Sequence, residues 1–370
     1  MWIAFAAVIG GLVLLVFSAD RFVDAAASAA QRLGVSALIV GLTVVAFGTS
    51  APEVTVSILA SLQGNTGIAI GNAIGSNIAN IGLIIGIAAM ITPLIVAQQL
   101  VRRELPILLA VSVLAFALLL DGQLSRLDGV VLIAGMMGFL IWLGYAARRG
   151  DAAVPIPHAA TPHTGPGSRP GSEPSIDVDI NRRSDGTDTK QSPVVASAVS
   201  DHAPSPTTSG GSLGRDFLWI VVGLALLIIA SRMLVWGAVE IAEALGIPEI
   251  IIGLTIVAIG TSLPELATSI AAAIKQQADI AVGNIVGSNI FNTLLVLPVA
   301  GLIAPGAVDR ALLTRDLPWM LALTVALVLF AWIGVRARNR ARQISRIEGA
   351  LLLIAFIGYL GWLVFGVIAA

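Results

Sequence analysis

Two segments of this chain are copies of each other. Residues 41–93 and 253–305 align without a gap at a constant offset of 212, and 26 of the 53 aligned positions are identical. Each copy carries the pattern GTS-x-PE followed by GN-x-x-GSN-x-x-N. The identical positions include Gly, Thr, Ser, Pro, Glu and Asn, so a shared excess of hydrophobic residues does not explain the match. The fold must therefore provide two equivalent environments for these polar residues.

The composition places this chain in a membrane. Hydrophobic residues make up 57% of the sequence and charged residues 12%, and the mean hydropathy is +0.93. A soluble domain usually carries about 25% charged residues, so this chain has too little charge to cover a water-facing surface. The net charge of -1 provides no basic excess for binding nucleic acid. The absence of Cys excludes disulfides and thiolate-bound metals.

Charge is concentrated in one segment in the middle of the chain. Residues 148–216 hold 15 of the 43 charged residues, all three His and a dense run of Pro, Ser, Thr and Gly, which predicts a disordered linker. About 300 residues remain, and a membrane helix with its turn takes roughly 30, so about ten spans fit. We expect these spans at 2–19, 38–62, 67–92, 104–120, 127–147, 217–236, 249–274, 279–304, 315–334 and 347–369.

The number of spans between the copies sets their relative direction. Five spans separate them, which is an odd number, so the second copy crosses the membrane in the opposite direction to the first. We therefore predict an all-α membrane protein with ten transmembrane helices arranged as two inverted five-helix repeats. The N-terminal half, 1–147, contains the first copy, and the C-terminal half, 217–370, contains the second. In transporters of this architecture the substrate site lies near the midplane, where the repeats meet.

The distribution of Lys and Arg predicts the orientation. With both termini outside, 17 of the 21 basic residues lie on the cytoplasmic side, as the positive-inside rule requires. These include Arg102, Arg103 and five Arg residues within 336–346, and the linker is then cytoplasmic as well. The N-terminus has neither a basic stretch nor a clear small-residue cleavage site, so we expect no cleaved signal peptide.

Two carboxylates lie at an unusual depth. Of the 22 acidic residues, only Glu53 and Glu265 fall within predicted spans and well away from both ends. An ionised carboxylate is costly there unless it is paired or coordinated, and the chain offers neither Glu an obvious intramembrane Lys or Arg. This pattern predicts a bound cation as the counter-charge. The alternative is that both Glu side chains are protonated or hydrogen-bonded structural residues.

The residues beside each Glu suit a hard cation. Pro52 and Pro264 have no N–H to offer the carbonyls of Gly48 and Gly260, so each helix should break there and leave carbonyl oxygens free. The adjacent Thr and Ser residues add hydroxyl oxygens. Ca²⁺ prefers about six to eight oxygen ligands, and two carboxylates match the charge of one Ca²⁺. The absence of Cys and of membrane His disfavours a Zn, Cu or Ni site.

The second segment of each copy adds small and amide residues. Ser76 and Asn80 are four residues apart and can present oxygens towards one point, and Ser288 and Asn292 repeat this spacing. The alternative to ion binding is that these residues only join helices. This alternative is stronger for the remaining amides of the motif. These remaining amides are Asn72, Asn77, Asn284 and Asn289.

With these motifs the sequence resembles the sodium/calcium exchangers of the cation/Ca²⁺ exchanger superfamily, as a prokaryotic member. GTSAPE with GNAIGSNIAN, and GTSLPE with GNIVGSNIFN, are similar to the two alpha-repeats of that family. The resemblance covers essentially the whole membrane region. It implies a secondary active antiporter, not an enzyme, that exchanges several Na⁺ for each Ca²⁺ by alternating access. It further implies a multi-pass protein of the prokaryotic inner membrane that functions as a monomer.

The resemblance also implies roles for individual residues. No cofactor is expected, because Ca²⁺ and Na⁺ bind as transported substrates. The family's Ca²⁺ site corresponds to the carboxylates of Glu53 and Glu265 and to the backbone carbonyls of Thr49 and Thr261. The flanking Na⁺ sites and the central position correspond to Ser50, Ser76, Ser262, Ser288, the carbonyls of Ala46 and Ala258, Asn80 and Asn292.

Asn292 is a departure from the family pattern. Many relatives carry Asp at this position, and the loss of that carboxylate argues against K⁺ co-transport. The residues themselves leave three rivals to a Na⁺/Ca²⁺ exchanger: an H⁺/Ca²⁺ exchanger, a cation channel and an intramembrane enzyme. The enzyme is disfavoured because no membrane His or Cys is present to act as base or nucleophile. A K⁺-dependent Na⁺/Ca²⁺ exchanger is the further alternative within the exchanger family. For the exchanger we expect the first span and its copy to move against the remaining helices.

Overall fold

The computed structural model describes residues 1–148, 212–246, 258–333 and 342–368. Within these ranges the chain is helical apart from two short strand pairs, which confirms the predicted all-helical class. The predicted linker, 148–216, lies almost wholly outside the described residues, so its disorder stays a prediction.

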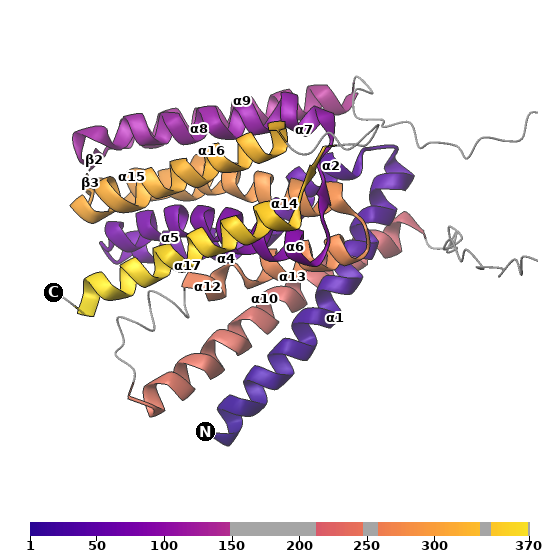
Figure 1. Cartoon of the computed structure of the whole chain (residues 1–370), viewed down its shortest axis with the longest axis horizontal. Coiled ribbons are helices and arrows are strands. Elements are labelled where there is room, and N and C mark those ends of the chain that lie inside the picture. Colours follow the sequence, from indigo (N-terminus) through magenta and orange to yellow (C-terminus); the bar gives the residue numbers. More distant parts are fainter. Residues whose placement is uncertain (149–211, 247–257, 334–341, 369–370) are drawn as a thin grey trace, which may run out of the picture. The chain divides into compact units, whose positions relative to one another are not determined.

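The two longest described helices form a pair. Helices α1 (Trp2–Leu33) and α10 (Leu213–Ala244) lie side by side (Figure 1). They run antiparallel, because the C-terminal end of α1 meets the start of α10: Arg32 Nε lies 2.7 Å from Asp216 Oδ2. This ion pair joins the two helices at one end.

Small residues bring the backbones of α1 and α10 together. A Cβ on Gly237 would lie 2.6 Å from the carbonyl oxygen of Ala4, and a Cβ on Gly11 would lie 3.1 Å from that of Ala230. Close approach through glycine is a common way for membrane helices to pack, because lipid gives no hydrophobic drive for association. The two helices therefore form one closely packed unit.

Each repeat folds as a broken helix followed by a second helix. In the first repeat the chain bends by 41° between residues 37–49 and 51–62, as expected from Pro52. The elements of the first repeat are α2 (Ala37–Val40), the π-helical turn η1 (Gly41–Val45), α3 (Ala46–Thr49), α4 (Ala51–Leu62), α5 (Thr66–Ala79), the π-helical turn η2 (Asn80–Ile85) and α6 (Gly86–Ile91). Those of the second are α12 (Ala258–Thr261), α13 (Leu263–Ile274), α14 (Ala278–Phe291), the π-helical turn η5 (Asn292–Val296) and α15 (Leu297–Ile303).

The boundaries of the two repeats match at the offset found in the sequence. Helices α4 and α13 begin and end 212 residues apart, and so do α5 and α14. The α5–α6 and α14–α15 segments are the most buried spans: 72% and 83% of the residues in their apolar 18-residue stretches are buried. The same share is 28% for α1 and for α10. The second helices of the two repeats therefore form the centre of the bundle, and the α1–α10 pair lies at its periphery.

The remaining helices surround this centre. They are α7 (Gln98–Arg102), α8 (Glu104–Leu118) with a short 3₁₀ turn (Leu119–Asp121), α9 (Arg126–Arg148), the π-helical turn η6 (Leu312–Asp316), α16 (Leu317–Ile333) and α17 (Arg346–Ile368). Two antiparallel strand pairs join the halves of the chain. Strand β1 (Leu94–Ile95) pairs with β4 (Gln343–Ile344), and β2 (Gln123–Leu124) pairs with β3 (Gly306–Ala307).

The span count agrees with a multi-pass membrane protein. Among the described residues, eight helices are long and apolar enough to cross a membrane, or nine when the bent α2–α4 segment is counted as one span. The predicted span 249–274 lies partly outside the described residues, and its described part forms α12 and α13.

Predicted boundaries of α1 and α10 differ from the structure, and α10 continues to Ala244 instead of ending at residue 236. The first span, predicted to end at residue 19, continues to Leu33 and ends at Gly34, whose φ of 65° suits glycine. The span predicted to begin at residue 217 begins at Leu213, because Ser212 caps the helix by accepting a hydrogen bond from Arg215 N–H. In both places charged residues continue the helix, since their partners lie on the neighbouring helix.

The packing of α1 on α10 predicts the effect of adding one methyl group. Gly237→Ala should lower the free energy of unfolding by about 1–3 kcal/mol, because the new Cβ would overlap the Ala4 carbonyl oxygen. Thermal unfolding of the purified protein in detergent measures this. Gly10→Ala is the control, because its nearest neighbour would be a flexible Met233 Cε at 3.7 Å. Equal stability of both variants would contradict the close packing.

Candidate cation site

The two buried carboxylates occupy equivalent positions in the two repeats. Glu53 lies in the first turn of α4 and Glu265 in the first turn of α13. Their exposed fractions are 1% and 0%. Each helix restarts just before its Glu after the break, and the free N–H groups of a helix N-terminus favour a nearby negative charge. The broken helices therefore place each carboxylate where the backbone supports its ionised form.

Reciprocal contacts bring the two carboxylates to one place. Ser50 Oγ donates a hydrogen bond to Glu265 Oε1 at 3.3 Å, and Ser262 Oγ lies 3.5 Å from Glu53 Oε1, at the limit of a hydrogen bond. Each serine belongs to the opposite repeat from the Glu that it contacts. The structure thus brings together four of the predicted site residues at the interface of the repeats.

Several oxygen atoms at this interface lack a partner. Within the part of the chain that the structure describes, one oxygen of each carboxylate, Glu53 Oε2 and Glu265 Oε2, accepts no hydrogen bond. The same holds for Asn80 Oδ1, Asn292 Oδ1 and Ser288 Oγ. None of the ion pairs among the described residues involves either Glu. A buried polar atom without a hydrogen-bond partner lowers the stability of the fold. The atoms named here are all oxygens, and a single cation can be coordinated by several of them at once.

Two asparagines hold the helices that carry the glutamates. Asn72 Nδ2 donates to the Glu53 carbonyl oxygen and to Ser57 Oγ, both at 3.0 Å. In the other repeat, Asn284 Nδ2 donates to Ser269 Oγ at 3.0 Å and to the Glu265 carbonyl oxygen at 3.4 Å. The helix-joining alternative is therefore correct for Asn72 and Asn284.

Other amides connect the repeats across the centre of the bundle. Asn80 Nδ2 donates to Asn289 Oδ1 at 3.0 Å, and Asn77 Nδ2 donates to Thr293 Oγ1 at 2.9 Å. Asn77 and Asn289 thus have structural partners, whereas both amide atoms of Asn292 are buried without one among the described residues. Asn292 is the amide whose surroundings leave it most available to a ligand.

Local helix geometry also marks the two central asparagines. Asn80 begins η2 and Asn292 begins η5. Single π-helical turns are rare and frequently occur at functional sites, because the extra residue in the turn shifts side chains and backbone groups. The sequence does not predict these π-helical turns, because the apolar pattern continues without interruption on either side of each Asn.

The threonines and alanines near the breaks make different contacts. Thr49 Oγ1 contacts Asn284 Oδ1 at 3.1 Å and the Ala46 carbonyl oxygen at 3.4 Å. The Ala46 carbonyl also accepts a hydrogen bond from Ser50 N–H at 3.0 Å. Thr261 ends α12, and Ala258 begins it. The Ala46 carbonyl is therefore already engaged.

One carbonyl that we expected to be free has a partner. Ser231 Oγ of α10 donates to the Gly260 carbonyl oxygen at 2.7 Å. Pro264 does leave this carbonyl without a helical partner, but a neighbouring helix supplies one. Sequence reasoning missed Ser231 because it lies far outside the repeat motif.

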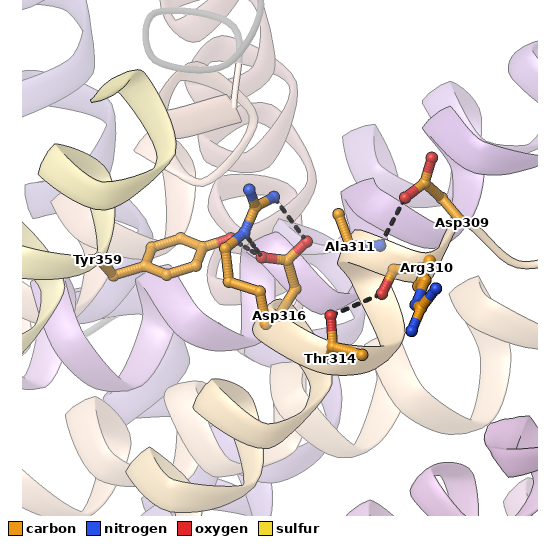
Figure 2. Close-up of polar contacts among 7 residues, drawn as sticks. Asp309, Arg310, Ala311, Thr314, Asp316 and Tyr359 are labelled. Atoms are coloured by element: carbon orange, nitrogen blue, oxygen red, sulfur yellow. Dashed lines mark hydrogen bonds and ion pairs between the residues drawn. The ribbon is translucent and has the colours of Figure 1, made fainter. Parts of the chain in front are cut away.

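A further polar cluster was also missed from the sequence. Figure 2 shows Asp316 in contact with Tyr359, whose hydroxyl donates to Asp316 Oδ1 at 3.1 Å. Arg315 forms a two-pronged ion pair with the same carboxylate at 2.7 and 3.1 Å. These contacts stabilise a buried charge at the start of α16. The signal was present: RELP at 103–106 repeats as RDLP at 315–318, again at an offset of 212.

The equivalent acid in the first half is less well supported. Glu104 is fully buried, and neither of its carboxylate oxygens has a hydrogen-bond partner among the described residues.

The described residues contain no group of three or more His, Cys, Asp or Glu side chains that could hold a metal ion. A cation at the repeat interface would therefore rely on the two carboxylates together with neutral oxygens.

Known proteins match this chain over nearly its whole length. The family model of the sodium/calcium exchanger protein matches residues 3–145 and 216–365. The chain is 39% identical over 363 residues to inner membrane protein YrbG of Escherichia coli, covering 98% of this chain and 97% of that protein. It is 34% identical over 350 residues to sodium/calcium exchanger MaX1 of Methanosarcina acetivorans, covering 95% of both.

A solved structure has the same fold. The sodium-calcium exchanger NCX_Mj, soaked with Na⁺ and Sr²⁺, superposes with a TM-score of 0.72 at 29% sequence identity. The alignment covers 97% of this chain and 98% of that chain. The likeness therefore extends over nearly the full length of both proteins.

The hydrogen bonds of Asn284 predict the cost of removing them. Asn284→Ala should lower the free energy of unfolding by about 1–3 kcal/mol, because the buried hydroxyl of Ser269 loses a donor and that of Thr49 loses the nearer of its two acceptors. Thermal unfolding in detergent measures the loss. Asn65→Ala, at an exposed Asn whose side chain does not cap α5, is the matched control and should unfold like the unmodified protein. Similar unfolding of both variants would rule out the positioning role.

Proposed function

The chain belongs to the sodium/calcium exchanger protein family, and from this premise we propose that it exchanges Na⁺ for Ca²⁺ across the prokaryotic inner membrane. Family membership makes it an antiporter, and it confirms that the chain is not an enzyme. The observation that carries the proposal is the meeting of Glu53 and Glu265 at the repeat interface, with one oxygen of each left without a partner.

The proposed Ca²⁺ ligands are the carboxylates of Glu53 and Glu265 with the backbone carbonyls of Thr49 and Thr261. Two carboxylates balance the charge of one Ca²⁺, and the mixture of carboxylate and carbonyl oxygens suits its flexible coordination. The proposed ligands of the flanking Na⁺ ions and of the central position are Ser50, Ser76, Ser262, Ser288, Asn80, Asn292 and the carbonyls of Ala46 and Ala258. The Ala46 carbonyl would have to give up an existing hydrogen bond.

Exchange follows from competition for shared oxygens. Ca²⁺ draws both carboxylates towards one ion, whereas Na⁺ ions spread the same two negative charges over separate positions. Both arrangements cannot exist at once, so binding of one ion displaces the other. An empty site would leave two buried carboxylates close together without a counter-charge, which disfavours reorientation without cargo. Coupled exchange rather than leakage is the result.

Alternating access requires two bodies that move against each other. We propose the α1–α10 pair as one body and the remaining helices as the other, in a ten-helix arrangement of two inverted repeats. A largely apolar cavity of about 660 Å³ lies between the α1–α10 pair and the α12–α13 segment. Closely packed interiors resist sliding, and incomplete packing permits it. The cavity thus supports movement at this interface rather than within the pair.

The proposal includes the orientation of the chain in the membrane, its domain organisation and its oligomeric state. Both termini face outside and the linker faces the cytoplasm, from the distribution of Lys and Arg. The division into 1–147, 148–216 and 217–370 remains our proposed domain organisation. One chain supplies both repeats of the site, so we propose that the monomer is sufficient for transport.

Uptake of radiolabelled Ca²⁺ into proteoliposomes tests the site. Glu53→Gln and Glu265→Gln should each reduce Na⁺-driven uptake by at least tenfold, because each removes half of the negative charge that faces the ion. Glu243→Gln, at an exposed position near the end of α10, is the control and should transport normally. Full uptake by both site variants would overturn the assignment of the two carboxylates.

The same vesicles identify the driving ion. An outward Na⁺ gradient should drive Ca²⁺ uptake, and a pH gradient without Na⁺ should not. Uptake driven by the pH gradient alone would favour an H⁺/Ca²⁺ exchanger that uses the same two Glu side chains as proton acceptors. A requirement for K⁺ would show that Asn292 does not prevent K⁺ co-transport.

A further inference from the structure

A single lysine ties α1 to the helix that carries Glu265. Lys275 directly follows α13, and its Nζ lies 2.7 Å from Asp20 Oδ1 and 2.7 Å from Asp24 Oδ1 of α1. The same Nζ donates a hydrogen bond to the Asp20 carbonyl oxygen at 2.7 Å. One ammonium group thus makes three contacts to α1. Lys275 lies 255 residues after Asp20 in the chain, so the sequence alone does not predict this contact.

The rest of this interface is loosely packed. The apolar cavity between the α1–α10 pair and α12–α13 is lined along its length by hydrophobic side chains, and Asp20 and Lys275 also line it. Apolar contacts alone therefore do not hold α1 firmly against α13. The Lys275 contacts provide a polar connection between α1 and α13, and the hydrogen bond from Ser231 to the Gly260 carbonyl connects α10 with α12.

Backbone hydrogen bonds on either side of Lys275 define the turn that ends α13. Lys275 N–H donates to the Ala271 carbonyl and Gln277 N–H donates to the Ala272 carbonyl, which closes the end of α13. Gln276 between them has a φ of 58°, the only positive φ of a non-glycine residue among the described residues. The equivalent position in the first repeat is Gly64, with a φ of 77°. The second repeat therefore keeps the same turn although the left-handed conformation is unfavourable for Gln.

The first repeat has no equivalent connection. At the offset of 212, Gln63 corresponds to Lys275, and the positions of Asp20 and Asp24 on α1 correspond to Arg232 and Trp236 on α10. A glutamine opposite an arginine and a tryptophan cannot form this ion-pair network. The helix contacts of the two halves differ as well. Helix α1 contacts α13 of the second repeat, whereas α10 contacts α3 of the first repeat more than α4, the equivalent of α13.

We propose that Lys275 is a latch that holds the ion pathway closed on its own side of the membrane. The inference rests on the proposed alternating access of α1 and α10 against the core. In the proposed orientation this side is the cytoplasmic side, so the latch favours the state in which the site opens outward. Movement of α1 that opens the cytoplasmic side must first separate Lys275 from Asp20 and Asp24. No such ion-pair network opposes opening of the outer side.

Distances between spin labels test this latch. The chain has no Cys, so pairs of introduced Cys can be labelled without background. Leu33 with Ile274 reports on the latched side, and the equivalent pair Leu245 with Leu62 reports on the opposite side; all four side chains are exposed. Double electron–electron resonance on each pair, with Na⁺ or with Ca²⁺, gives the populations of the two states.

Lys275→Gln copies the residue found at the equivalent position, Gln63. It should change the population ratio by about fivefold in favour of the longer Leu33–Ile274 distance, the size expected for two partly exposed ion pairs. The Leu245–Leu62 distance should shorten in parallel. An unchanged ratio in Lys275→Gln, in a protein whose labels do move with Na⁺ and Ca²⁺, would overturn the latch alone. Labels that move under no ion condition would instead contradict alternating access itself.

Two further variants separate the latch from a general effect of charge. The double variant Lys275→Asp with Asp24→Lys keeps the same three charges in exchanged positions and should restore the original population ratio. Arg346→Gln removes an exposed positive charge whose guanidinium contacts the Ile91 carbonyl at 3.4 Å and not α1, and it should leave the ratio unchanged. A shift in Arg346→Gln as large as in Lys275→Gln would assign the effect to surface charge and overturn the latch.

Discussion

The structure depends on placing two carboxylates together inside an apolar bundle. Like charges at such a depth repel each other and lose their hydration, so the surrounding residues must compensate. The protein uses helix N-termini created by Pro52 and Pro264, hydroxyl groups from the opposite repeat and amide groups behind each Glu. The serine hydroxyl groups contact one oxygen of each carboxylate, and the other oxygen has no partner among the described residues. A transported cation supplies the partner that these two oxygens lack.

The layers of the bundle follow from this requirement. The second helices of the repeats are almost entirely enclosed, and their Asn residues join the two repeats across the centre. The α1–α10 pair contributes little to this enclosed centre, but it packs closely within itself through glycines. Ser231 of α10 reaches the broken helix at Gly260. The pair thus contacts the helix beside the site without forming the core, which is what a moving element of an exchanger requires.

Much of the site could be predicted from sequence, because polar residues inside a membrane span are costly and are retained only for a reason. The repeated Glu, Pro, Ser and Asn residues therefore indicated the helix breaks and the shared interface. Features that depend on partners distant in the chain could not be predicted. Hydropathy ended the first span near Asp20, whereas Lys275 and Asp216 provide partners for the charges of the longer helix. The π-helical turns at Asn80 and Asn292 leave no mark on the apolar pattern.

Inverted repeats make the two sides of a transporter nearly equivalent, and differences between the repeats then decide which state is preferred. At the site the repeats match at Glu53 and Glu265, so chemistry there gives little reason to favour one side. Away from the site they differ where Lys275 replaces Gln63 and where α1 carries Asp residues that α10 lacks. A difference of this kind changes the balance between the two states without altering the ligands. Ion selectivity and directional preference can therefore vary independently in such a fold.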